Sequence, residues 1–136
     1  METRKKNFCE NRNASGALTF LEGERDVPFP IRRVYYIYDV LPGGRRGFHA
    51  HKNLEQYLIC VSGSCKILLE DASGRQTVAL ERPREGLYIA PHVWHEMYDF
   101  APGTVLLALA SDYYDENDYI RQYEEFCRCM KEVWIK

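Results

Sequence analysis

The sequence predicts an all-β fold of the jelly-roll type, a barrel or sandwich of about eight or nine antiparallel strands followed by one short C-terminal helix. Short apolar or aromatic runs recur between turn signals, as in sandwiches and barrels. Aromatic residues are abundant, with ten Tyr, six Phe and two Trp, and rings with a polar tip suit strands and pocket walls. The 136 residues match one domain of ordinary size, so we expect residues 1–136 to form a single domain.

The expected strands follow one another along the chain, each bounded by turn chemistry. Proline or glycine lies in every separating segment, from the Val-Pro-Phe-Pro segment at 27–30 to the Ala-Pro-Gly segment at 101–103. Residues 71–74 (Asp-Ala-Ser-Gly) lie between two alternating runs, which predicts a β-hairpin. The expected strands are residues 17–21, 31–40, 56–61, 65–70, 76–80, 86–89, 96–100 and 105–109, with a further strand around the first histidine pair.

Only the tail has the periodicity of a helix. Ile120, Tyr123 and Phe126 recur at helical spacing, so we expect a helix over about residues 118–131. Asp115 or Asn117 precedes it and can cap its first turn.

Composition and the chain termini exclude several classes of function. The formal net charge is −2, from 18 basic and 20 acidic side chains, so no overall field favours nucleic acid. No apolar run is long enough for a signal peptide or a membrane span, which predicts a cytoplasmic protein with no membrane partner. The five cysteines are odd in number and form no CxxC pair, so free thiols are expected rather than a disulfide framework.

Histidines provide the candidate site. His49 and His51 follow a Gly/Arg-rich loop, and strand alternation places them on one face with Glu55 if the strand continues. His95 lies at the start of a later strand, whereas His92 follows Pro91 in a turn and is expected to face solvent.

This pattern resembles the first motif of the cupin superfamily, in which glycine, five residues, His-x-His and a glutamate follow in order. Gly43, His49, His51 and Glu55 have that spacing, and His95 lies where a second motif would place a third histidine. Cupins are small β-barrels with a site inside the barrel. The spacing leaves two chemistries open. The three histidines and Glu55 could hold Fe, Mn, Ni or Zn, or the histidines could act as acids and bases near neutral pH.

A longer resemblance points to the second chemistry. Five blocks, at residues 28–37, 46–52, 86–89, 93–100 and 110–121, are similar to those of the dTDP-sugar 3,4-ketoisomerases, a metal-independent cupin family. The resemblance implies conversion of dTDP-4-keto-6-deoxyglucose to a dTDP-3-keto-6-deoxyhexose with no cofactor and no metal, and residues 48–52 (Phe-His-Ala-His-Lys) favour the galacto product. It also implies a homodimer that exchanges N-terminal strands, and a downstream aminotransferase that makes a 3-amino sugar.

The same resemblance supports His49 and His51 as catalytic residues. We assign carbon-proton transfer to His49 and the oxygen-to-oxygen shuttle to His51. Arg121, on the expected tail helix, is interpreted as a structural salt-bridge partner. Two alternatives stay open, a metal-dependent cupin oxygenase and a non-catalytic cupin that binds a nucleotide sugar. The expected substrate-binding residues are Arg33, Tyr35, Arg46, Lys52 and His95.

Overall fold

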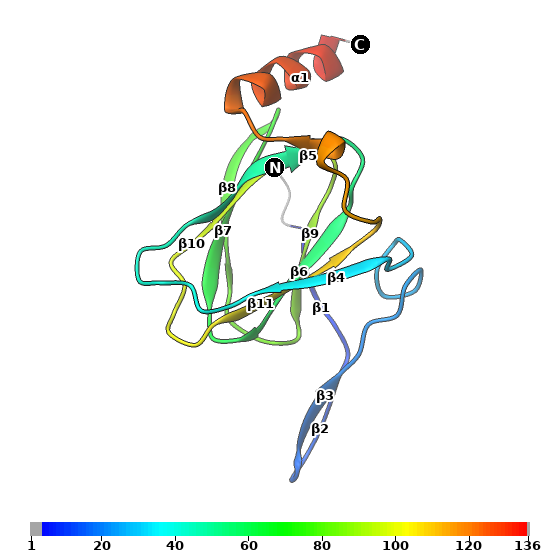
Figure 1. The fold of residues 1–136 in the computed structure, drawn as a ribbon. Helices are drawn as coiled ribbons and strands as arrows, with labels where there is room; N and C mark the ends of the chain where they lie inside the picture. The colour runs from blue at the N-terminus through cyan, green and yellow to red at the C-terminus, as the bar shows by residue number, and fades with distance from the viewer. Residues whose placement is uncertain (1–3, 136) are drawn as a thin grey trace.

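The computed structural model describes residues 4–135 and consists of two antiparallel sheets that face one another, with the single α-helix at one end (Figure 1). The first sheet has the order β1 (Lys5–Asn7), β9 (Glu85–Ile89), β6 (Gln56–Ser62), β11 (Val105–Ala110) and β4 (Arg33–Ile37). The second has the order β12 (Tyr119–Ile120), β5 (Arg46–His51), β10 (Trp94–Tyr98), β7 (Cys65–Asp71) and β8 (Gly74–Leu80). The all-β class with one C-terminal helix is therefore confirmed.

The core lies between the two sheets because alternate side chains of each strand point inward. Leu58 of β6 and Leu106 of β11 meet Ile67 and Leu69 of β7, and all four are fully buried. Tyr35 packs against the same cluster from β4. Apolar packing thus extends to β4, the edge strand of the first sheet.

Most expected strands are present with small shifts at their ends. The hairpin at 71–74 is confirmed, since Asp71 pairs with Gly74 and accepts a hydrogen bond from the Ser73 amide at 2.8 Å. The strand expected at 31–40 is only Arg33–Ile37, and that expected at 96–100 runs from Trp94 to Tyr98. Asp39 and Asp99 have φ values of 55°, a left-handed conformation that interrupts the strand geometry after each of these shorter strands.

The expected start of the tail helix is wrong. Residues 116–118 form a short 3-10 helix, η1 (Glu116–Asp118), and the α-helix α1 begins only at Tyr123 and ends at Ile135. Asp115 caps η1, where its side chain accepts a hydrogen bond from the Asn117 amide. Between the two helices, β12 pairs with the end of β5, and Ile120 is fully buried. Pairing with a sheet edge and burial of Ile120 favour an extended conformation over the helical pattern.

Two N-terminal strands escape prediction because their sequences are polar and lack apolar alternation. β1 adds to the edge of the first sheet, and β2 (Glu10–Asn13) pairs only with β3 (Gly16–Thr19) among the described strands. Figure 1 shows this β2–β3 hairpin extending beyond the barrel. All five cysteines are free. Within residues 4–135, no helix is long and apolar enough to cross a membrane.

Candidate active site

A β-bulge in β5 orients the first histidine of the site. In the pairing with β10, His49 lies opposite His95 and Gly47 lies opposite Glu96, so Phe48 is the extra residue. Gly47 and Phe48 both have positive φ values, 91° and 62°, which is rare for a bulky residue. The bulge leaves Phe48 largely exposed and sets His49 across from His95.

Three imidazoles form a compact cluster. The ring centroids lie 4.9 Å apart for His49 and His51, 4.5 Å for His49 and His95, and 6.0 Å for His51 and His95. His95 is fully buried, His51 is 3% exposed and His49 is half-buried. The sequence places two of these side chains on one strand, and the pairing of β5 with β10 brings in the third.

Hydrogen bonds orient two of the rings. His49 Nδ1 lies 3.1 Å from the Gly47 carbonyl, and His95 Nδ1 lies 3.2 Å from the Val93 carbonyl. Because a carbonyl oxygen only accepts hydrogen bonds, each Nδ1 carries the proton and each Nε2 has a free lone pair. His95 Nε2 is buried and has no hydrogen-bond partner among the described residues. The cluster is therefore equipped to accept protons.

Burial keeps all three imidazoles neutral near pH 7. Removal from water lowers the pKa of His49 to about 4. The same desolvation, followed by the charge of His49, lowers the pKa of His51 to about 3. The pKa of His95 is also well below its ordinary value, mainly because of desolvation. Neutral imidazoles can act as general bases, and each ring disfavours a second charge in the cluster.

A cavity of about 330 Å³ opens beside His49. Arg33, Tyr35 and Arg46, all expected to bind substrate, line it. Lys52 does not; its side chain is exposed beyond the end of β5, and its backbone amide donates to the Asp118 carbonyl at 2.9 Å. The complete lining is Arg33, Tyr35, Tyr36, Ile37, Arg46, Gly47, His49, Met97, Tyr119 and Arg121.

The Tyr35 hydroxyl is held in a fixed orientation. It donates a hydrogen bond of 2.5 Å to Oε1 of the fully buried Gln56. Burial, followed by the nearby Tyr119, raises the pKa of Tyr35, so the hydroxyl keeps its proton. The Arg33 guanidinium lies 5.5 Å from the Tyr35 ring, and its Nε is buried without a hydrogen-bond partner in the described chain. Because Arg33 also lines the cavity, its guanidinium is a group there that suits an anionic ligand.

The tail contributes groups that the sequence did not assign to the site. The Tyr119 ring lies 4.4 Å from the His51 ring and 4.9 Å from the His49 ring. Arg121 lines the cavity and also forms the expected salt bridge, with hydrogen bonds of 2.6 and 2.9 Å to Glu116. The pairing of β12 with β5 brings both residues to the site. The helical spacing of the tail predicts a helix there and gives no indication of this pairing.

The imidazole cluster bears on whether a metal could bind. One ring nitrogen from each of His49, His51 and His95 lies within 4.8 Å of the others, so these three could hold an ion. Glu55 is not part of this group, because its carboxylate accepts a hydrogen bond from the Tyr88 hydroxyl at 2.6 Å. The four ligands of the metal-dependent oxygenase alternative, three histidines and Glu55, are therefore not brought together.

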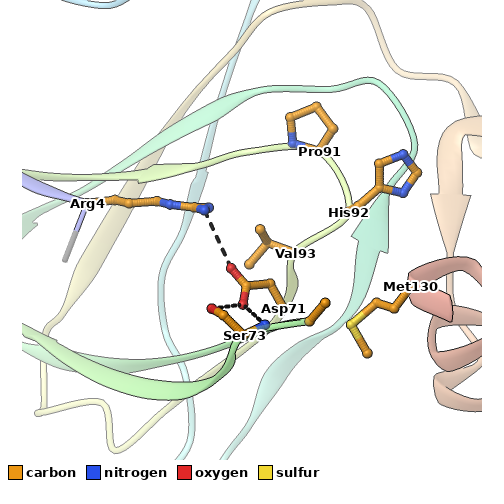
Figure 2. Close-up of a pocket in the computed structure, with 8 residues that line it drawn as sticks. Arg4, Asp71, Ser73, Pro91, His92, Val93 and Met130 are labelled. Carbon is orange, nitrogen blue, oxygen red and sulfur yellow. Dashed lines mark hydrogen bonds and ion pairs between the residues drawn. The ribbon is translucent and has the colours of Figure 1, made fainter. Parts of the chain in front are cut away.

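The fourth histidine lies in a different cavity. Figure 2 shows His92 with Arg4, Asp71 and Met130 around a hollow of about 190 Å³. Its side chain is half-buried rather than solvent-facing, and its φ is 61°. The His92 amide donates to the His51 carbonyl at 2.7 Å, so it contacts the site only through the backbone.

We expect Gly47→Ala to lower the free energy of unfolding by about 2 kcal/mol, because an added Cβ would lie 2.9 Å from the His95 carbonyl oxygen at a strained φ. Gly43→Ala is the matched control: its φ is 76°, but no atom lies within 4 Å of the added carbon. The control should show only the conformational cost, about 1 kcal/mol. Urea denaturation measures both, and equal losses would contradict a role for the close approach of β5 and β10.

Known proteins share this fold and chain length. The family described as "FdtA: WxcM-like, C-terminal" matches residues 1–131. A TDP-4-oxo-6-deoxy-alpha-D-glucose-3,4-oxoisomerase from Aneurinibacillus thermoaerophilus is 47% identical over 133 residues, which cover 98% of this chain and 96% of that protein.

Two solved structures are similar over nearly the whole chain. A variant of the 3,4-ketoisomerase QdtA from Thermoanaerobacterium thermosaccharolyticum, in complex with TDP-4-keto-6-deoxyglucose, has a TM-score of 0.94 at 44% identity and 100% coverage of both chains. The WlaRB TDP-quinovose 3,4-ketoisomerase from Campylobacter jejuni has a TM-score of 0.87 at 51% identity, with coverage of 91% of this chain and 95% of that one. This chain therefore belongs to the FdtA family, among the TDP-sugar 3,4-ketoisomerases that its histidine blocks resemble.

Proposed function

We propose that this chain is an isomerase that converts TDP-4-keto-6-deoxyglucose to a TDP-3-keto-6-deoxyhexose. The observation that carries the proposal is the cluster of three neutral imidazoles beside a cavity lined by arginine and tyrosine side chains. The relatives named for this activity support the choice of substrate.

The reaction needs only proton transfers. His49 Nε2 accepts the proton from C3, which the neighbouring C4 ketone acidifies, and the released electron pair forms an enediolate with its charge on O4. His51 Nε2 accepts the proton of the O3 hydroxyl and delivers it to O4. His49 then returns its proton to C4 as the C3 carbonyl forms. Protons and electrons balance within one substrate molecule.

The remaining predicted residues bind and orient the substrate in this proposal. Arg33 and Arg46 lie at the cavity and suit the diphosphate oxygens, to which a guanidinium presents several donors. Tyr35 lines the cavity beside the sugar, whereas His95 is fully buried outside the lining and supports the sugar site through its contact with His49. Lys52, exposed at the end of β5, contributes charge at the rim.

The configuration of the product at C4 depends on which face of the enediolate receives the proton. We retain the galacto product that residues 48–52 favour. The gluco product is the alternative, and the 51% identity to an enzyme named for TDP-quinovose supports it. Proton NMR in ordinary water distinguishes them, because H4 and H5 couple strongly in a gluco ring and weakly in a galacto ring. Either C3 ketone is a suitable substrate for an aminotransferase.

Deuterium exchange tests the activity. Incubation with TDP-4-keto-6-deoxyglucose in D2O should remove the C3 proton signal as the 3-keto product forms, and C4 should carry deuterium in those turnovers in which protonated His49 exchanges with solvent before it delivers its proton. A non-catalytic binding protein would leave the C3 proton in place. An oxygenase would contain stoichiometric Fe, Mn or Ni after purification without chelator, and would consume oxygen. Either result would overturn the proposal.

We further propose a homodimer in which the β2–β3 hairpin crosses to the partner. Leu18 and Phe20, in and just after this hairpin, are 58% and 45% exposed, which is costly for large apolar side chains in water. The buried Val27 and Phe29 anchor the segment that leads back to the barrel, near the expected hinge at 28–30.

Light scattering tests the assembly. The wild type should have twice the 16.0 kDa mass of one chain, and Leu18→Asp combined with Phe20→Asp should shift it to the monomer. Leu41→Asp is the control, since Leu41 is 78% exposed in the loop after β4 and should leave the dimer intact. A monomeric wild type, or a dimeric double variant, would contradict the exchange.

A further inference from the structure

We infer that Asp118 is a positioning residue for His51. The carboxylate of Asp118 keeps the proton on His51 Nδ1 and thereby leaves His51 Nε2 free to exchange protons in the cavity. The expected effect on turnover rests on the proposed isomerase function. The expected tautomer of His51 follows from the geometry alone.

The contact lies on the buried side of the ring. His51 is the last residue of β5, and its Nδ1 lies 3.2 Å from Asp118 Oδ2. In the part of the chain that the structure describes, this buried nitrogen forms no hydrogen bond of good geometry, and Asp118 Oδ2 is the acceptor that lies at ion-pair distance from it. The carboxylate, which accepts but does not donate when ionised, is therefore the group that selects the tautomer.

The carboxylate is itself fixed in place. Oδ1 accepts a hydrogen bond from the Asn53 amide at 2.8 Å, and Oδ2 accepts one from the Leu54 amide at 3.3 Å. The backbone carbonyl of Asp118 accepts a third, from the Lys52 amide at 2.9 Å. The Asp118 side chain is only 14% exposed. Three backbone donors just beyond β5 thus hold Asp118 against the histidine strand, although they lie more than 60 residues away in the sequence.

His51 differs from its neighbours in the charge of this partner. His49 and His95 each use the backbone carbonyl two residues earlier in the sequence, and a carbonyl is neutral. An ionised carboxylate also stabilises the imidazolium that forms when Nε2 accepts a proton, because charge-assisted hydrogen bonds are the stronger ones. Of the three rings, His51 is therefore the one with an anionic partner at Nδ1, while desolvation and the nearby His49 still lower its pKa to about 3, below that of His49.

Asp118→Asn separates positioning from simple loop anchoring. The asparagine oxygen can still accept the Asn53 amide, so the loop stays anchored. Its NH2 group can instead face His51 Nδ1 and donate to it, which moves the ring proton to Nε2 and blocks that nitrogen as a base. In serine proteases the equivalent change produces the wrong tautomer and a loss of about 10⁴-fold in kcat.

Kinetics and nitrogen NMR together test the inference. We expect Asp118→Asn to lower kcat about 100-fold or more while KM changes less than about threefold. Asp112→Asn is the control: Asp112 has the same charge and lines, with Asp118, a second hollow, but its carboxylate accepts a hydrogen bond from the neighbouring Tyr113 amide, so the substitution should leave kcat unchanged. In spectra of ¹⁵N-labelled protein, His51 should be protonated at Nδ1 in the wild type and at Nε2 in Asp118→Asn.

Each outcome decides the matter. A wild-type His51 protonated at Nε2 overturns the inference, even if the variant fails to fold. A variant with wild-type kcat overturns it as well. So does a variant whose KM rises by the same factor as its kcat falls while the tautomer of His51 stays unchanged. If the wild type shows the expected tautomer but does not isomerise TDP-4-keto-6-deoxyglucose, the proposed function fails while the assignment of Asp118 stands.

Discussion

Turnover of TDP-4-keto-6-deoxyglucose should fall by about a thousandfold in His49→Asn and in His51→Asn, because positioned acids and bases contribute about 10²–10⁴-fold to proton transfer. Asparagine has no group that takes up a proton near neutral pH. It is smaller than histidine and polar, so the fold should persist. TDP binding should change little, since Arg33 and Arg46 stay in place. Stopped assays of product formation and calorimetric titration with TDP measure the two effects.

His92→Asn provides the matched control for both variants. It makes the same substitution at a histidine whose ring lies in the second cavity, away from the imidazole cluster (Figure 2). Its φ of 61° suits asparagine, and its backbone hydrogen bond to His51 does not involve the side chain. Turnover should stay near the wild-type value. Retained turnover in both His49→Asn and His51→Asn would refute the catalytic assignment.

Acid should destabilise the wild type more than His49→Asn. The pKa of His49 is about 4 in the folded protein and 6.5 when unperturbed. Between these pH values the unfolded chain binds more protons than the folded chain. The contribution of His49 to the free energy of unfolding is therefore complete above pH 6.5 and is lost as the pH drops toward 4. One pKa unit corresponds to about 1.4 kcal/mol, which gives a loss of about 3 kcal/mol for this side chain.

The comparison between proteins isolates this contribution. Carboxylates also titrate near pH 4, but they do so in both the wild type and the variant. Urea denaturation at several pH values should therefore show wild-type stability decreasing by about 3 kcal/mol relative to His49→Asn between pH 7 and pH 4. His92→Asn should follow the wild type. Parallel curves for wild type and His49→Asn would mean that His49 titrates normally in the fold.

The strand pattern and the histidine pair were predictable because both depend on local sequence. Alternation along one strand places His49 and His51 on the same face. The Asp-Ala-Ser-Gly sequence at 71–74 forms its hairpin from turn residues that are neighbours in the chain. The start of the tail helix was not predictable, because Ile120 has helical spacing with Tyr123 but is buried in a strand. That one error hid Asp118, Tyr119 and Arg121 from the expected site.

Glu55 shows how a sequence motif can predict a site residue that the fold places elsewhere. Its spacing from His51 suggested a fourth ligand, but β5 ends at His51 and the Tyr88 hydroxyl binds the glutamate instead. Strand alternation holds only while the strand continues, and the sequence does not mark where pairing stops. The cytoplasmic location and the downstream aminotransferase stay predictions.

By itself, the sequence determined the fold class, the two histidines of β5 and the family, because these depend on periodicity and on blocks of neighbouring residues. The tertiary structure alone decided which distant groups join them. His95 arrives through the pairing of β10 with β5, and Asp118 and Arg121 arrive through the pairing of β12 with the same strand. Such pairings depend on burial and hydrogen bonding between segments far apart in the chain, and local propensity does not record them.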